Sequence, residues 1–250
     1  MTEAPPAPTL LGVARLVQVM DRLRAPGGCP WDAKQTHLSL VTHLLEEAYE
    51  AAEAIEQGTR ADLREELGDV LLQVVFHAAI AAADPADPFD LDDVARGVAD
   101  KLVRRHPHVF AAETAELLSA DESYRRWDQI KAEEKARSSA LDGIPAAQSP
   151  LARAQKVFAR ARRAGLEVGP ESAAEETASS PGAGPADDAD RSSAGAGLGA
   201  RLAALAAEAD AAGLDAEAEL RAAIRRVEAR IRDLEAVGAG RDAPDANQRR

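Results

Sequence analysis

The chain has 250 residues, a net charge of −13 and only 3% aromatic residues. Such an acidic chain does not fit a nucleic-acid-binding protein, which usually has a basic face, or a protein that binds anionic membranes. Few aromatic residues and an alanine-rich apolar content favour helices and argue against a β-sandwich or barrel. The single cysteine, Cys29, excludes an intrachain disulfide and a cysteine-rich zinc site. The N-terminal sequence has no basic start and no apolar run typical of a signal peptide, which favours a cytoplasmic location.

Apolar residues recur every three to four positions along most of the chain, which predicts helices. Glycine and proline interrupt this pattern: Pro26 and Gly27 mark a loop, Gly58 ends one helix, and Pro107 ends another. The predicted helices cover residues 10–24, 39–57, 60–83, 91–105, 119–137, 150–164, 198–212 and 216–237. The sequence therefore predicts an all-α fold.

Composition also divides the chain into segments. A stretch rich in Gly, Ser, Ala, Asp and Pro, without apolar periodicity, predicts a disordered acidic linker. All histidines and aromatic residues lie at or before Phe158, so we expect the chemistry in the first part of the chain. The expected segments are a disordered N-terminus (1–9), a main domain (10–140), a connecting turn and helix (141–168), the linker (169–197), two C-terminal helices (198–237) and a disordered tail (238–250).

Two neighbouring predicted helices each offer a pair of carboxylates one turn apart. The second predicted helix has Glu47 and Glu50 opposite its apolar stripe, and the third has Glu66 and Asp69 in a narrow polar stripe on an otherwise apolar surface. If these helices pack antiparallel, the four carboxylates converge. Four oxygen donors without Cys or His suit Mg²⁺ or Mn²⁺ rather than zinc. The same spacing is also compatible with a solvated glutamate face and an interhelical salt-bridge network.

The residues around these carboxylates resemble the MazG family. Residues 46–50 read EEAYE, similar to the EExxE motif of the family, and residues 66–69 read ELGD, similar to its ExxD motif. Further similar segments, spread over roughly residues 10–165, are CPWD at 29–32, QTH at 35–37, LLQVVFH at 71–77, KLVRRHPHVF at 101–110, and Trp127, Ile130, Lys131 and Lys135 in a WxxIKxxEK pattern. MazG proteins are all-α nucleoside triphosphate pyrophosphohydrolases.

This resemblance implies a reaction in which a nucleoside triphosphate and water give a nucleoside monophosphate and pyrophosphate. It implies Mg²⁺, or alternatively Mn²⁺, as the cofactor. The implied metal ligands are Glu47, Glu50, Glu66 and Asp69. The resemblance also implies a catalytic role for Glu46, which would position or activate the water.

Four other residues are predicted to bind the substrate. Lys101 and Arg105 lie one helical turn apart and can clamp phosphates, although a basic helix C-terminus also complements the helix dipole. Trp31 and Trp127 are candidates for stacking on the base, and each is also compatible with a place in the core.

The C-terminal part resembles a second MazG-like domain that has lost its site. The sequence LGARL at 198–202 aligns with the ELGDVL region of the first domain. In this register Ala200 falls opposite Asp69 and Gly197 falls opposite Glu66. Both ligands of the ExxD motif are therefore missing, so we expect only the first site to work.

Together these features predict a helical bundle of the MazG type, followed by the acidic linker and a C-terminal helical remnant. The expected function is magnesium-dependent hydrolysis of nucleoside triphosphates, which would cleanse the nucleotide pool. Nucleoside triphosphates are the expected partners, nucleic acid and membranes are not, and the family resemblance implies a homodimer. The alternatives are a catalytically weak nucleotide-sensing or protein-binding regulatory module and a selective phosphoribosyl-ATP or dUTP pyrophosphatase.

Overall fold

The computed structural model describes residues 10–110, 119–134, 139–166, 168–169 and 186–241. Within these residues every regular element is a helix, which confirms the predicted all-α fold. The chain divides into two compact units, residues 1–131 and 132–250. No helix among the described residues is both long enough and apolar enough to span a membrane.

The helices of the first unit closely follow the predicted periodicity. Two short helices, α2 and α6, lie where only loops were expected, and each begins at a proline, whose fixed φ angle suits the first helical position. The helices are α1 (Leu10–Arg24), α2 (Pro30–Lys34), α3 (Val41–Gln57), α4 (Arg60–Ala82), α5 (Leu91–Arg105), α6 (Pro107–Phe110) and α7 (Ala120–Glu134), whose last residues pass the boundary of the unit.

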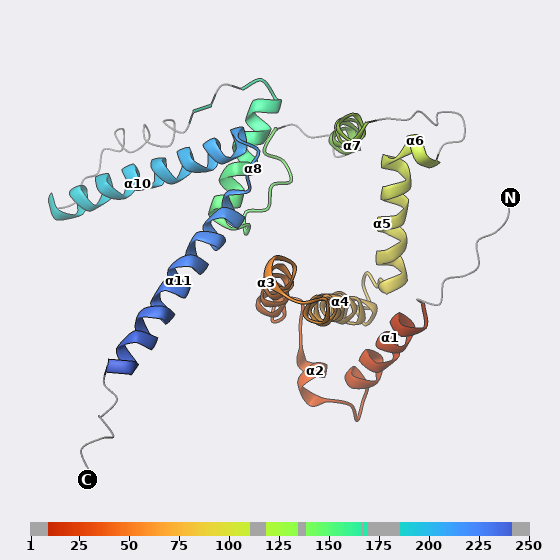
Figure 1. Cartoon of the computed structure of the whole chain (residues 1–250). Helices are drawn as coiled ribbons and strands as arrows, with labels where there is room; N and C mark the ends of the chain where they lie inside the picture. Colours follow the sequence, from red (N-terminus) through yellow and green to blue (C-terminus); the bar gives the residue numbers. More distant parts are fainter. Residues whose placement is uncertain (1–9, 111–118, 135–138, 167, 170–185, 242–250) are drawn as a thin grey trace, which may run out of the picture. The chain divides into compact units, whose positions relative to one another are not determined.

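Helices α3 and α4 form an antiparallel hairpin, with the two helices side by side in Figure 1. Gly58 and Thr59 make the connection. The Thr59 hydroxyl accepts hydrogen bonds from the first-turn amides of α4, and the Asp62 carboxylate accepts one from the Thr59 amide at 2.7 Å. These hydrogen bonds lower the pKa of Asp62, because they stabilise its ionised form. This capping box fixes the start of α4 and thereby the position of its carboxylates relative to α3.

Helix α4 is the central helix of the first unit and packs against α1, α3 and α5. Its apolar residues meet the core residues Met20 and Leu40 at Val75 and Phe76, all at most 4% exposed. The C-terminal half of α4 is thus anchored in the core, whereas Leu67 and Val74 remain exposed. The carboxylates of α4 therefore lie on a helix that core packing holds in place.

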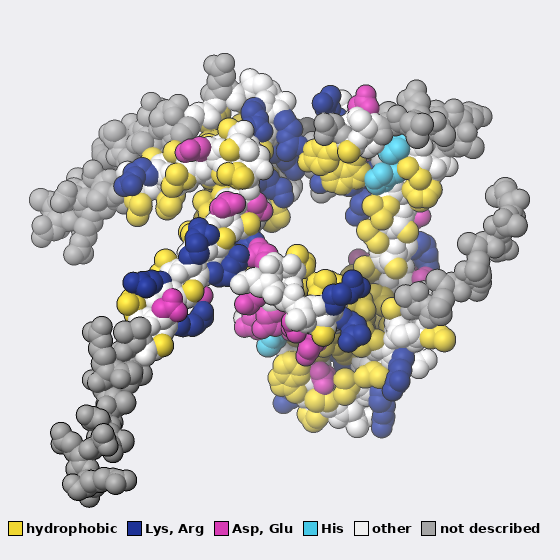
Figure 2. Space-filling view, viewed as in Figure 1, with side chains coloured by type: hydrophobic (Ala, Val, Ile, Leu, Met, Phe, Trp, Pro, Cys, Tyr) yellow, Lys and Arg dark blue, Asp and Glu magenta, His cyan; other side chains and the backbone are white. Residues whose placement is uncertain are grey.

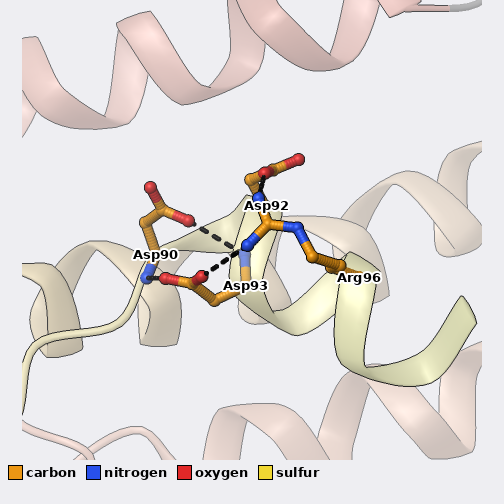
Figure 3. A network of polar contacts seen from close by, with 4 residues as sticks. All are labelled: Asp90, Asp92, Asp93 and Arg96. Carbon is orange, nitrogen blue, oxygen red and sulfur yellow. Dashed lines mark hydrogen bonds and ion pairs between the residues drawn. The ribbon is translucent and has the colours of Figure 1, made fainter. Parts of the chain in front are cut away.

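Helix α5 has its own N-terminal capping box, formed by Asp90 and Asp93 (Figure 3). Arg96, one turn further along, forms ion pairs with Asp92 and Asp93, at 3.1 Å to the latter. These acidic side chains lie at the positive end of the helix dipole, where they stabilise the helix.

The second unit consists of α8 (Pro150–Arg163), α10 (Ala186–Ala211) and α11 (Ala216–Arg241), and both long helices pack on α8. Gln155 of α8 holds the turn between them: its side-chain amide donates to the carbonyl of Leu214 and accepts from the amide of Ala216 at 3.1 Å. Arg162 of α8 pairs with Asp210 of α10 at 2.6 Å.

Two expectations for this region were wrong in part. Helix α10 begins at Ala186, well inside the expected linker 169–197, directly after Pro185, the last proline before the helix. No proline follows to remove a backbone donor, so the helix is continuous despite its glycine and serine content. Helix α11 ends at Arg241, inside the expected tail. Most of the expected linker, with the segments 1–9 and 242–250, lies outside the described residues.

Candidate functional site

The α3–α4 hairpin brings three carboxylates together. Glu47 of α3 and Glu66 and Asp69 of α4 each place an oxygen within 4.8 Å of the others, and all three residues are half-buried. Figure 2 shows the acidic side chains gathered over this part of the molecule. The antiparallel packing that the sequence required for convergence is thus present for these three residues.

The electrostatics of the cluster disfavour three full negative charges. Burial raises the pKa of Glu47, and the neighbouring charges of Asp69 and Glu50 raise it further. Burial likewise raises the pKa of Glu66, followed by the charges of Glu50 and Asp69. A cation placed among these oxygens would relieve both effects.

The two remaining predicted acidic residues lie at the edge of the cluster. Glu50 acts on the pKa of both Glu47 and Glu66, but it is outside the set of three converging oxygens. Glu46 is exposed, and its carboxylate lies 3.3 Å from Nδ1 of His43 on the same helix. The structure therefore separates a compact set of three from two adjacent glutamates.

The donor set fits a hard divalent cation. Three carboxylates on rigid helices supply only oxygen ligands, and oxygen ligands are preferred by Mg²⁺ and Mn²⁺. Because three side chains do not complete six-fold coordination, such an ion would keep positions for water and for phosphate oxygens.

Trp31 lies on α2 with 55% of its surface exposed. Its ring meets the edges of Phe76, with the ring centres 6.5 Å apart, and of His43, at 6.1 Å. The side chain of Gln35 donates to the Trp31 carbonyl at 3.0 Å and fixes the backbone of this short helix. Trp31 therefore contacts the core residue Phe76, while more than half of its surface remains exposed.

Arg105 and Trp127 are brought together, and Arg105 is almost fully buried. The guanidinium carbon of Arg105 lies 5.5 Å from the Trp127 ring centre, and the ammonium of Lys131 lies 4.5 Å from it. Both distances are typical of cation–π contacts. Tyr124 stacks on the same ring at 6.1 Å, whereas Lys101 is exposed on α5. The contact of Lys131 with Trp127 was not predicted, although the two residues lie four positions apart, a spacing that places them on one face of a helix.

Sequence reasoning also missed a histidine pair. The Nδ1 atoms of His37 and His77 lie 2.8 Å apart, and the ring planes are within 1° of parallel with centres 5.1 Å apart. So short a nitrogen–nitrogen distance at that centre separation places the rings edge to edge rather than face to face. One Nδ1 therefore donates a hydrogen bond to the other. Nε2 of His77 and Oε1 of the buried Gln73 have no partner among the described residues.

Comparison with known proteins agrees with the motifs. Residues 35–110 match the MazG nucleotide pyrophosphohydrolase domain. The nucleoside triphosphate pyrophosphohydrolase of Mycolicibacterium smegmatis is 50% identical over 153 residues, which are 60% of this chain and 46% of that protein. The chain belongs to the MazG family. A MazG-related protein from Thermotoga maritima, known from its crystal structure, is 33% identical, covers 47% of this chain and 97% of its own, and superposes with a TM-score of 0.39.

The MazG domain match includes the carboxylate cluster, Lys101 and Arg105, whereas Trp31 and Trp127 lie outside it. A 26.1 kDa protein encoded in the blaB 3′ region of Streptomyces cacaoi is 47% identical over 209 residues, 83% of this chain and 76% of that protein. A match of this extent continues beyond the first unit. The chain spans less than half the length of the M. smegmatis MazG relative.

Proposed function

We propose that this chain hydrolyses nucleoside triphosphates to nucleoside monophosphates and pyrophosphate, and that it removes aberrant triphosphates from the nucleotide pool. The main support is the convergence of Glu47, Glu66 and Asp69 on the α3–α4 hairpin, inside the region that matches the MazG domain. The names of similar proteins, such as the M. smegmatis relative, agree with this chemistry. In the second unit the aligned positions hold Gly197 and Ala200, so the first unit would contain the one working site.

We propose that Glu47, Glu66 and Asp69 hold Mg²⁺, or Mn²⁺ in its place, with Glu50 as a fourth ligand. When bound, the cation supplies neutralisation of phosphate charge and polarises the anhydride. Glu66 and Asp69 lie one turn apart on α4, so this helix would hold the cation and, through it, the phosphates in a fixed position for attack by water. Glu46, at the exposed edge, would orient that water, and its contact with His43 would hold its side chain in place.

The remaining predicted residues would bind the nucleotide. Lys101 and Arg105 lie on one face of α5 for contact with phosphate, and the Trp127 ring already orients the Arg105 guanidinium. The half-exposed ring of Trp31 offers a face for the base. Nucleoside triphosphates are metabolites of the cytoplasm, so we propose that the protein works there.

We further propose that the first unit works as a homodimer. Many large apolar side chains of this unit remain exposed, among them Leu44, Leu45 and Ile55 on the face of α3 opposite its carboxylates. Contiguous apolar surface of this kind is typical of a protein interface. A second copy would cover it and complete the helical bundle.

The test is pyrophosphate release by the purified chain with each standard nucleoside triphosphate and dITP, in Mg²⁺ and in EDTA. We expect metal-dependent release that Glu66→Gln and Asp69→Asn abolish. Glu53→Gln is the matched control, because Glu53 is an exposed glutamate of α3 outside the cluster. Thermal stabilisation by Mg²⁺ without substrate provides a readout independent of turnover. A folded chain that releases no pyrophosphate with any of these nucleotides would refute the proposal.

A further inference from the structure

Helix α11 has a row of large apolar side chains that no described element covers. They alternate at spacings of four and three residues, which is the heptad pattern of a coiled-coil seam. The members are Leu220, Ile224, Val227, Ile231 and Leu234, each between 48% and 60% exposed. Figure 2 shows apolar side chains along α11 between basic and acidic ones. We call these five residues the α11 seam.

The α11 seam is distinct from the face by which α11 contacts its own unit. Helix α11 packs on α8 near its N-terminus, where Ala216 is buried and Ala218 and Ala222 are half-buried. Small side chains thus face α8, and large ones face away from it. Two different faces of one amphipathic helix predict two different partners.

We propose that the α11 seam pairs with the α11 seam of a second copy of this chain, as a parallel two-stranded coiled coil. The residue types at the seam favour this arrangement. Ile224 and Ile231 occupy the a positions, and Leu220 and Leu234 occupy d positions. β-branched residues at a with leucine at d favour parallel dimers.

The flanking charges are complementary in the same arrangement. In a parallel pair each g position faces the following e position of the other helix. Arg230 at g then faces Glu235 of the second copy, while Glu228 at e faces the small side chain at position 223. The residue types at a and d, together with this Arg230–Glu235 pair, support the parallel arrangement.

Helix α10 offers the rival occupant within the same chain. Leu198, Leu202 and Leu205 are also about half-exposed and have the same alternating spacing. Gly213, with φ of 71°, makes the turn that joins α10 to α11. Closing the two helices on each other would need this turn to fold further, because both apolar rows are exposed as they stand. The α10 row is thus an alternative that an experiment can separate.

The test is cysteine cross-linking in the full chain, on a Cys29→Ser background that removes the native thiol. Val227→Cys places a thiol in the seam, and Leu234→Cys places one at its end. Ala229→Cys, on the exposed opposite face of α11, is the matched control. Under mild oxidation we expect both seam variants, but not the control, to form a covalent dimer, since facing d positions satisfy disulfide geometry. Adding Ile231→Glu to Val227→Cys should lower the yield about ten-fold or more, whereas adding Ala229→Glu should not.

Three results would overturn the proposal. The first is a cross-link yield of Val227→Cys no higher than that of Ala229→Cys. The second is cross-linking of Val227→Cys without Leu234→Cys, which indicates antiparallel pairing. The third is a disulfide within the monomer when Leu202→Cys and Ile224→Cys are combined, which would identify α10 as the occupant. A dimer through the first unit would not produce the difference between the seam and its control, so the outcome does not depend on the proposed enzyme activity.

Discussion

Replacing Glu47 by Gln should make the protein more stable without metal and less stable with it. Glu47 supplies one of the three converging carboxylates, and Gln keeps its size while it removes its charge. Without a cation, the variant loses the repulsion from Asp69, which is the largest charge contribution to the raised pKa of Glu47. With a cation bound, the variant instead lacks one of the carboxylates that would hold the ion. The sign of the effect should therefore reverse between EDTA and Mg²⁺.

The geometry sets the size of the metal-free effect. Oxygens of Glu47 and Asp69 lie within 4.8 Å of one another, and two unit charges at that distance repel by about 0.9 kcal/mol at the dielectric constant of water. Physiological salt, with a Debye length of about 8 Å, lowers this repulsion to about half, so the full effect is expected at low ionic strength. For a chain of this size, about 1 kcal/mol corresponds to a rise of about 2–4 °C in Tm. Saturating Mg²⁺, at about a hundred times its Kd, should stabilise the wild type by about 2.7 kcal/mol and the variant by less.

The pH dependence follows from the direction of the pKa shift. A glutamate whose pKa is raised in the folded state binds a proton more readily in that state than in the unfolded chain. Its charge therefore destabilises the fold at neutral pH, and this destabilisation is removed as the pH falls through the raised pKa. The advantage of Glu47→Gln in EDTA should thus be largest near pH 7 and should vanish below the ordinary glutamate value of 4.5.

Thermal unfolding in EDTA and in Mg²⁺, between pH 4 and 8, measures both effects. Glu53→Gln, on the same helix and outside the cluster, serves as the control for loss of one negative charge from an acidic chain. If Glu47→Gln lowers the metal-free Tm, or raises it no more than Glu53→Gln does, the carboxylates do not repel one another and the argument is wrong.

Three further predictions concern the scaffold. Thr59→Ala should remove the capping box of α4 and cost about 0.5–2 kcal/mol in urea unfolding, with the stabilisation by Mg²⁺ retained. His77→Phe should remove the hydrogen bond to His37 and cost about 0.5–1.5 kcal/mol at pH 7.5. Burial lowers the pKa of His77 in the folded state, so the wild type should lose stability as the pH falls below 6.5. The stability difference between the wild type and His77→Phe should therefore shrink as the pH is lowered. A difference that stays constant with pH would contradict this reasoning. Gln155→Ala should destabilise the second unit by about 1–3 kcal/mol through two lost hydrogen bonds, measured by hydrogen exchange at the α10–α11 turn, and unchanged exchange there would contradict it.

Local patterns in the sequence were sufficient for the long helices of the first unit and for the family. Helix positions follow from apolar spacing, and helix ends follow from residues such as Thr59 and Asp90, whose side chains bond to nearby backbone amides. The motif residues Glu66 and Asp69 are close in sequence on one helix, so their shared face could be predicted from helical geometry alone. The start of α10 at Ala186 was missed, because a composition typical of disorder does not show where a helix begins.

Contacts between residues distant in sequence were decided only by the tertiary structure. The sequence assigned four carboxylates to one set, and the packing of α3 on α4 brings three of them within 4.8 Å and leaves Glu50 at the edge. The pairing of His37 with His77 and the burial of Arg105 beside Trp127 each join segments separated by many residues. Helical periodicity determines which face a side chain occupies, but the crossing of helices determines which faces meet. The sequence alone therefore indicated the chemistry of this protein, and its packing decided which residues stand together to perform it.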